Sequence, residues 1–345
     1  MSDIRIGMRC DAGPTTGVGH LVRSMALAEE LTARGAQVVF LGDIGGVAWA
    51  ERELRDRDLP LVPGPQTPED LVNAVGDLKL DGLVIDSYTL NPACAAAVRA
   101  VGVPVLSIVD GETRGQEPDL FLDQNLDAEL ADVPVPAGSR RLAGLKYVLL
   151  RDSVRRLRPA APKVAQEGRP HLLAFFGGTD AFGAGPVVAR LVLATGAPVA
   201  MTVVAGSPAL RASLEALEPG PGQELRVIDP TDRLPEHIAA ADVVVSASGT
   251  STWELLCLGA AAAMVWVVDN QWLGYERVMA RGLTAGIGLL ADLADPGSPA
   301  SAEAVVTLRR LLTDPVVRTE LSAKAMAVVD GAGRERVADE FLALL

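Results

Sequence analysis

A glycine-rich segment with a single histidine carries the clearest chemistry in the sequence. Gly19 and His20 follow an apolar run, Ile4–Arg9, and begin an Ala/Leu-rich segment, Gly19–Ala33, that is expected to be a helix. Glycines at a strand-to-helix turn let backbone N–H groups approach anionic oxygens. An imidazole at such a turn accepts a proton near neutral pH and is suited to activating water or a hydroxyl. The alternative is that His20 only caps the helix. We favour catalysis, because a glycine-lined turn leaves the ring open to a ligand.

Small residues, hydroxyls and amides follow three expected strands in the second half of the chain. The loops in question hold Gly177, Gly178, Thr179, Ser248, Gly249, Thr250, Ser251, Glu254, Asn270 and Gln271. Backbone amides and hydroxyls of this kind can hold a diphosphate without a metal ion. Glu254 lies at an expected helix start, where a carboxylate is stabilised by the helix dipole. It is therefore either a helix-start residue or a partner for ribose hydroxyls.

Other candidate sites carry less weight. His171 and His237 are expected to be structural, and without clustered histidines a His-based metal site is not expected. Asp56-Arg57-Asp58 fits an acidic motif of metal-dependent sugar transferases, but it lies in a charged run that is typical of a solvated helix face. No GxSxG or HExxH motif occurs. We expect neither a metal nor a cofactor beyond the nucleotide of the substrate.

Charge and composition exclude several classes of protein. The 345 residues carry a net charge of −13, with 31 Lys and Arg against 44 Asp and Glu. A nucleic-acid binder needs a basic face, so that function is excluded. The three widely spaced cysteines indicate neither a disulfide framework nor a structural zinc site. The apolar stretch Leu255–Val268 has 14 residues, fewer than the roughly 20 that a membrane-spanning helix needs. We expect a soluble cytoplasmic protein, either monomer or dimer.

The elements that must position these loops form two βα arrays. In the first half, strands are predicted at Ile4–Arg9, Gln37–Leu41, Gly82–Asp86 and Val103–Val109. In the second half, they are predicted at His171–Phe176, Val199–Val204, Glu224–Ile228, Val243–Ser246 and Ala262–Val267. Ala/Leu-rich amphipathic segments alternate with them, which is typical of α/β proteins. We expect two Rossmann-like, doubly wound domains that face each other across a cleft, with ligands beyond the carboxyl ends of the strands.

The expected boundaries follow composition. Residues 1–155 form the N-terminal domain with the catalytic base, and the Pro-rich, charged segment 156–170 is a linker. Residues 171–314 form the nucleotide-binding domain. The helical residues 315–345 are expected to pack back on the N-terminal domain.

The segment from Arg9 through Asp11 to Gly19-His20-x-x-Arg23 resembles the nucleotide-sugar hydrolases of pseudaminic acid biosynthesis and their spore-coat polysaccharide relatives. Further similar segments follow in order at Ile85–Tyr88, Asp123–Asn125, Gly144–Arg151, Gly177–Asp180, Ser246–Glu254, Asn270-Gln271 and Asp330–Val337. One departure is Ser87, which stands where the hydrolases usually carry His. The resemblance implies a GT-B fold in which the C-terminal domain holds UDP.

The resemblance also implies residue roles. His20 is the general base at the anomeric carbon, and we place Asp11 and Tyr88 beside it in the catalytic set. The nucleotide-binding set is Gly19, Gly177, Gly178, Thr179, Ile228, Ser248, Gly249, Thr250, Ser251, Glu254, Asn270 and Gln271. The sugar-binding set is Arg9, Asp86 and Asn125, with Tyr88 also lining the sugar site.

Two activities fit these residues. The main prediction is a UDP-sugar hydrolase in which His20 activates water that displaces UDP. The alternative is an inverting, metal-independent glycosyltransferase in which His20 deprotonates a small-molecule or glycan acceptor. A third hypothesis, a catalytically silent sugar-nucleotide binder, conflicts with the presence of His20.

Overall fold

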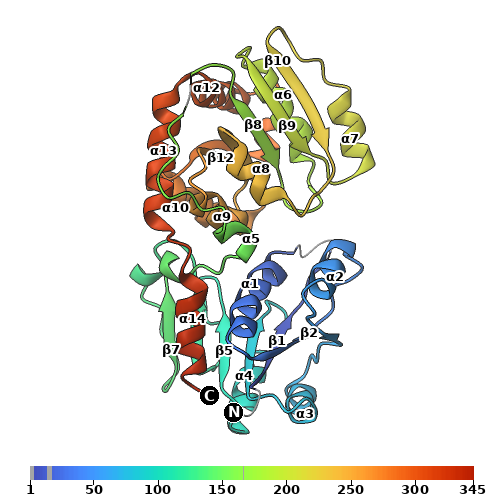
Figure 1. Cartoon of the computed structure of the whole chain (residues 1–345), viewed down its shortest axis with the longest axis vertical. Coiled ribbons are helices and arrows are strands. Elements are labelled where there is room, and N and C mark those ends of the chain that lie inside the picture. The colour runs from blue at the N-terminus through green and yellow to red at the C-terminus, as the bar shows by residue number, and fades with distance from the viewer. Residues whose placement is uncertain (1–3, 14–17, 166) are drawn as a thin grey trace. The chain divides into compact units, whose positions relative to one another are not determined.

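The chain folds into two compact units (Figure 1). The computed structural model describes residues 4–13, 18–165 and 167–345, apart from the side chains of residues 48 and 270. Unit 1 consists of Met1–Asp152 and Gly331–Leu345, and unit 2 consists of Ser153–Asp330. Residues 14–17 of the first glycine-rich segment lie outside the described residues.

Unit 1 is built on a seven-stranded parallel sheet with the order β3-β2-β1-β4-β5-β6-β7. Its strands are β1 (Arg5–Cys10), β2 (Gln37–Leu41), β3 (Leu61–Val62), β4 (Gly82–Asp86), β5 (Val105–Ile108), β6 (Leu120–Asp123) and β7 (Arg140–Ala143). Its helices are α1 (Gly19–Ala33), α2 (Ala48–Arg55), α3 (Pro68–Asp77), α4 (Ala93–Ala100), η1 (Ala128–Leu130), η2 (Leu145–Tyr147) and α14 (Gly333–Leu342). The order of the strands reverses between β1 and β4.

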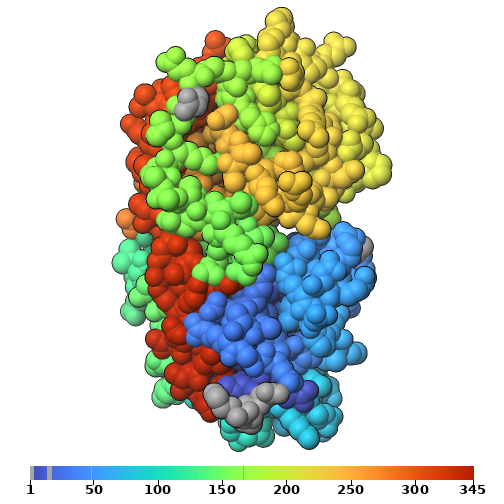
Figure 2. Space-filling model, viewed as in Figure 1, coloured from blue at the N-terminus to red at the C-terminus, as the bar shows by residue number. Residues whose placement is uncertain are grey.

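Helices cover both faces of this sheet, as the burial of its strands requires. In β4, Val84 packs into the cluster that contains residues of α1 and α14, whereas Leu83 and Ile85 pack into the cluster that contains residues of α3 and α4. Successive side chains of a strand point to opposite faces, so an all-apolar strand buries both. Figures 1 and 2 show α14, in red, beside α1, in blue.

Unit 2 repeats this plan with a six-stranded parallel sheet in the order β10-β9-β8-β11-β12-β13. Its strands are β8 (His171–Phe175), β9 (Val199–Val204), β10 (Gln223–Ile228), β11 (Val243–Ala247), β12 (Ala262–Trp266) and β13 (Ala285–Leu289). Its helices are α6 (Ala184–Ala194), α7 (Pro208–Glu215), α8 (Leu234–Ala240), α9 (Ser251–Cys257), η3 (Asp269–Gln271), α10 (Trp272–Ala280), α11 (Leu290–Leu293), α12 (Pro299–Thr313) and α13 (Pro315–Val328), and the short helix α5 (Asp152–Arg155) begins at the boundary between the units. Here the order reverses between β8 and β11.

The two parallel α/β sheets confirm the predicted fold class. The strands Gln37–Leu41, Gly82–Asp86 and Val199–Val204 and the helix Gly19–Ala33 have the predicted bounds. The prediction did not include β3, β6, β7 or β13, which are short or interrupted by polar residues or glycine.

The boundaries of the units differ from the expected ones. In the expected linker, Lys163 donates through Nζ to the carbonyls of Ile238, Ala239 and Ala241, so this segment is packed onto unit 2. The helical segment 315–345 is divided, because α13 belongs to unit 2 and only α14 belongs to unit 1. A turn with Gly331 at φ +82° separates the two helices. Across the described residues, none of the helices has the length and apolar character needed to cross a bilayer.

Candidate active site

His20 and Asp86 form a pair at the point where the strand order of unit 1 reverses. His20 lies in the first turn of α1, which follows β1, and Asp86 is the last residue of β4. The Nδ1 atom of His20 lies 2.6 Å from Oδ1 of Asp86. The Asp86 side chain is 1% exposed and the His20 side chain 18%. A buried carboxylate on Nδ1 holds the proton there and leaves Nε2, which faces away from Asp86, as the basic nitrogen.

Arg23 binds the other side of Asp86. Its Nε and Nη2 atoms donate to the two carboxylate oxygens of Asp86, each at 2.7 Å. Its Nη1 and Nη2 atoms also donate to the two oxygens of Asp110, at 3.0 and 3.1 Å. The Arg23 side chain is only 5% exposed. Asp86 therefore cannot turn away from His20 without breaking a two-bond contact with Arg23.

Tyr88 and Asn125 join the same network through Asp110. The hydroxyl of Tyr88 donates to Asp110, and Nδ2 of Asn125 donates to Asp110 at 2.8 Å. The Tyr88 ring packs edge-to-face against His20 with 4.4 Å between ring centroids. Tyr88 is 42% exposed, so its ring borders both His20 and the surface. The structure thus brings His20, Tyr88 and Asn125 into one network of contacts.

The charges of this network shift its pKa values. Burial by itself lowers the pKa of His20, but the adjacent Asp86 carboxylate outweighs burial and raises that pKa above its ordinary value. For Asp86 and Asp110, burial raises the pKa, but Arg23 outweighs it and lowers both pKa values. Burial and the neighbouring Asp110 raise the pKa of Tyr88. Tyr88 is consequently a neutral hydrogen-bond donor near neutral pH.

Two sugar-binding assignments need correction. Arg9 is fully buried, donates to the carbonyl of Pro65 at 2.9 Å and pairs with Asp11 at 2.8 Å, so it supports the loop beneath the site. Asp86 is also buried, and its oxygens are taken by His20 and Arg23. Neither side chain lies where it can contact a sugar.

Two other residues of this region have structural contacts. The Asp11 carboxylate pairs with Arg9 and accepts from the amide of Asp43 at 3.0 Å, so the structure brings it to Arg9 and not to His20. Ser87 Oγ accepts from the amides of Thr89 and Leu90 and forms the turn after β4. Gly19 begins α1 next to His20 and is partly exposed.

Arg23 belongs to the Gly19-His20-x-x-Arg23 motif but was given no role, and Asp110 was not identified from the sequence. Arg23 stands three residues after His20 in α1, a spacing that places both side chains on one helix face. A basic residue one helical turn after the histidine was therefore a usable signal. Asp110 follows β5, and only the strand order, with β5 beside β4, places it near His20.

In unit 2, the loop after β8 is open and built from small residues. Gly177, Gly178 and Thr179 are exposed, and a Cβ atom added at Gly178 would meet no atom within 4 Å. Asp180 is 5% exposed and accepts from the amides of Ala184 and Gly185, each at 2.8 Å, at the start of α6. The first amides of α6 are therefore occupied by Asp180, and an anion in this region would bind the exposed loop instead.

The loop after β11 lies across the reversal point of unit 2 from the β8 loop. The amides of Ser248 and Gly249 already donate to the carbonyls of Val265 and Ala247, each at 3.0 Å. These two amides are therefore not free to donate to a diphosphate, which corrects the role expected for them. Gly249 is exposed, and Thr250 and Ser251 are partly exposed, so the hydroxyls of these last two residues are the accessible donors.

Three further predicted residues border this loop. Gln271 lies in η3, and its Oε1 accepts from the amide of Val267 at 3.0 Å, while its Nε2 lies 3.9 Å from the position of a Cβ at Gly249. Asn270 lies in η3 as well, but its side chain is outside the described residues. Glu254 lies in the first turn of α9, directly after this loop, and is 6% exposed.

Ile228 ends β10, two strands away from the reversal point, and its carbonyl accepts from the amide of Ala205 at 2.9 Å. It is partly buried at the carboxyl edge of the sheet. It therefore lies on the same edge as the exposed loops after β8 and β11.

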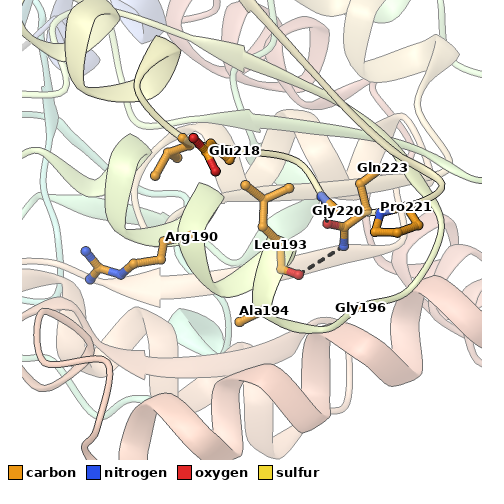
Figure 3. Close-up of a pocket in the computed structure, with 9 residues that line it drawn as sticks. Arg190, Leu193, Ala194, Gly196, Glu218, Gly220, Pro221 and Gln223 are labelled. Atoms are coloured by element: carbon orange, nitrogen blue, oxygen red, sulfur yellow. Dashed lines mark hydrogen bonds between the residues drawn. The ribbon is translucent and has the colours of Figure 1, made fainter.

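A pocket lies elsewhere in unit 2. It has a volume of about 420 Å³ and lies between the end of α6 and the segment before β10, beside Leu193, Gly220 and Gln223 (Figure 3). This is the amino end of the strands, opposite the loops after β8 and β11. Gln223 there donates to the carbonyl of Leu193 at 3.0 Å, so it braces the fold. In the part of the chain that the structure describes, no cluster of three His, Cys, Asp or Glu side chains is arranged to hold a metal ion.

Comparisons with known proteins relate the whole chain to sugar transferases. No protein-family model matches it. The chain is 29% identical over 359 residues to the UDP-N-acetylglucosamine--N-acetylmuramyl-(pentapeptide) pyrophosphoryl-undecaprenol N-acetylglucosamine transferase of Clavibacter michiganensis, covering 93% of this chain and 92% of the relative. It is 27% identical to the transferase of the same name from Sorangium cellulosum, covering 96% of this chain and 85% of the relative. The crystal structure of MurG from Acinetobacter baumannii superposes with a TM-score of 0.69 at 17% identity over 99% of both chains.

These comparisons establish the GT-B fold and correct the expected family. The curated relatives are named as transferases, so the resemblance to UDP-sugar hydrolases was wrong. The reason is physical. A histidine next to glycines can act as a base, and loops of small residues can hold the phosphates of a nucleotide. Neither feature indicates whether the base activates water or an acceptor hydroxyl. The chain is thus similar along nearly its whole length to enzymes that use a UDP-sugar.

Proposed function

We propose that this protein is an inverting glycosyltransferase that moves a sugar from a UDP-sugar to an acceptor hydroxyl without a metal ion. The observation that carries the proposal is the His20–Asp86 pair, with Nδ1 on a buried carboxylate at 2.6 Å. The full-length similarity to transferases supports an acceptor hydroxyl as the nucleophile.

In the proposed reaction, Nε2 of His20 accepts the proton of the acceptor hydroxyl as its oxygen attacks the anomeric carbon. The bond from that carbon to the β-phosphate oxygen of UDP breaks, and UDP leaves with the electron pair. A single displacement inverts the configuration at the anomeric carbon. Asp86 stabilises the imidazolium that forms, as a carboxylate does for a catalytic histidine elsewhere.

We assign donor binding to unit 2. The exposed residues Gly177, Gly178 and Thr179 and the hydroxyls of Thr250 and Ser251 are suited to diphosphate oxygens. Gln271 borders this loop and is suited to hydroxyls of the donor sugar. Tyr88 and Asn125 of unit 1 are assigned to the sugar that accepts the transfer or is transferred. The relatives act on N-acetylmuramyl-(pentapeptide) pyrophosphoryl-undecaprenol, so a lipid-linked glycan is the first acceptor to test.

The test measures UDP release from UDP-N-acetylglucosamine with and without acceptors, including the lipid-linked one. We expect release that depends on an acceptor and falls by a factor on the order of 10²–10⁴ in His20→Ala. UDP binding, measured by calorimetry, is expected to be unchanged in that variant. His237→Ala is the matched control, because this histidine lies in α8 of unit 2. Release that needs no acceptor, or a fully active His20→Ala, would overturn the proposal.

A further inference from the structure

We infer that Arg23 and Asp110 are positioning residues for His20, which lock Asp86 in place and link it to Tyr88 and Asn125. The inference rests on the proposed function for its activity readout, but its geometry stands apart from any substrate. Each residue acts through another side chain and does not contact the reacting atoms.

Arg23 fixes the orientation of Asp86 by using its whole guanidinium. Four N–H···O contacts of 2.7–3.1 Å divide between Asp86 and Asp110. Oδ2 of Asp86 also lies 3.4 Å from the hydroxyl of Ser24, while Oδ1 faces His20. A planar fork that holds two carboxylates is a geometry that lysine cannot reproduce. Rotation of Asp86 would break contacts on both of its oxygens at once.

Asp110 connects the Arg23–Asp86 contact to the exposed part of the site. It accepts from Arg23, from the hydroxyl of Tyr88 and from Asn125, whose Nδ2 also donates to Asp123 at 2.9 Å. Tyr88 in turn carries the guanidinium of Arg114 over its ring, 4.1 Å from the centroid. The Asp110 carboxylate thus binds Tyr88 and Asn125, the two residues proposed to face the sugar. It also binds Arg23, which in turn holds Asp86, the partner of His20.

The charges around His20 give Asp110 an electrostatic role as well. Asp86 at the end of β4, Arg23 on α1 and Asp110 after β5 all act on the imidazole, with the Tyr88 ring packed against it. These two carboxylates and one guanidinium sum to a charge of −1, which a protonated His20 neutralises. Replacing Asp110 by a neutral residue removes the excess negative charge, so the proton on His20 is held less tightly.

The test follows the imidazole of His20 directly by NMR titration. The chain has three histidines, so the His20 signals are assigned as those missing from His20→Gln. In Asp110→Asn the titration midpoint of His20 is expected to fall, and the acid limb of the pH–rate profile to move to lower pH with it. Asp110→Glu keeps the charge and is expected to restore the midpoint towards that of the unmodified protein. Arg23→Lys is expected to lower kcat by roughly tenfold to a hundredfold through loss of the fork.

Asp119→Asn is the matched control. Asp119 forms an ion pair with Arg99 at 2.9 Å in the same unit. Its replacement by Asn is expected to leave the titration midpoint of His20 unchanged. An unchanged midpoint in Asp110→Asn, or an equal shift in Asp119→Asn, would overturn the inference. A shifted midpoint in a protein without acceptor-dependent transfer would overturn the proposed function and leave the inference standing. Thermal melting of each variant separates misfolding from the expected effects.

Discussion

The two units place their candidate residues at the same topological position, where the strand order reverses, but the residue types at that position differ. In unit 1, the loops beside the reversal of strand order carry ionised side chains, and Arg23, Asp86 and Asp110 are held by mutual contacts. In unit 2, the equivalent loops carry glycines and hydroxyls, such as Gly178 and Ser251. A proton acceptor needs one fixed ring nitrogen, whereas a diphosphate needs several donors and room for its oxygens. The same fold therefore supports either chemistry, and the loop residues decide which.

The largest effect is expected from replacing Asp86. In Asp86→Asn, the amide can donate to Nδ1, which favours the imidazole tautomer with the proton on Nε2 and removes the base. We expect kcat to fall by a factor on the order of 10³, while the affinity for UDP stays unchanged because we assign donor binding to unit 2. Steady-state kinetics and UDP calorimetry measure the two quantities. An equal loss of UDP affinity would contradict the division of roles between the units.

A smaller effect is expected from adding a charge to the open loop of unit 2. Gly178 has space for a side chain, so Gly178→Asp is expected to fold and to repel a diphosphate. The KM for the UDP-sugar is expected to rise roughly tenfold to a hundredfold, with little change in kcat. Gly76→Asp is the control, because Gly76 lies in α3 of unit 1 and also has open space. A fall in kcat at unchanged KM would remove the β8 loop from the donor site.

Acid is expected to distinguish the units by stability. The lowered pKa values of Asp86 and Asp110 stabilise unit 1 above the unfolded-state pKa near 3.9, and this stability is lost as the pH falls through the folded values. His20 has the opposite dependence, because its raised pKa stabilises the fold below its unfolded-state pKa, and this contribution is lost as the pH rises through the folded value. In unit 2, burial raises the pKa of Asp180, so protonation of this carboxylate removes no stability, whereas burial lowers the pKa of His171 in β8, so protonation of that imidazole does remove stability there.

We therefore expect the amides of β4 and α1 to lose hydrogen-exchange protection before those of α6, whose first amides donate to Asp180, as the pH falls from about 4 to 2. Mass spectrometry of peptides from each unit measures this difference. In Asp110→Asn the difference is expected to shrink. Earlier loss of protection in α6 would contradict this view of the two units.

The smallest expected effect is that of a chelator. We assign the diphosphate to the exposed loop Gly177–Thr179 and to the hydroxyls of Thr250 and Ser251. Transfer is therefore expected to proceed at the same rate in EDTA. A chelated sample with added magnesium serves as the comparison. A loss of most of the rate on chelation, restored by magnesium, would contradict metal-independent donor binding.

The sequence located the loops but not the contacts among them. His20, Gly178 and Ser251 were identified because glycines, hydroxyls and a histidine stand next to recognisable strands. Arg9 and Asp86 were assigned to sugar binding, but both are buried. A motif gives residue types and order, whereas burial depends on which strands become neighbours.

The same limit explains the missed strands and the missed residues. The strand β13 contains Gly286 and Gly288, and β7 begins with two arginines, so neither has the apolar run of a central strand. Asp110 became visible only with the strand order, since β5 and β4 are neighbours in the sheet. Arg23 had a local signal, its spacing from His20, but its two carboxylate partners lie 63 and 87 residues away in the chain.

The return of α14 to unit 1 has a consequence for biosynthesis. Val337, Ala338 and Phe341 of this helix are fully buried in the core of unit 1, and Arg334 pairs with Glu29 at 2.9 Å. Because Gly331–Leu345 follows the whole of unit 2 in the chain, unit 2 is fully synthesised while unit 1 still lacks a helix. Nascent chains that end before Gly331 would expose the apolar surface of unit 1 that Val337, Ala338 and Phe341 cover to chaperones and proteases. Synthesis of α14 is thus the step that completes the unit carrying His20.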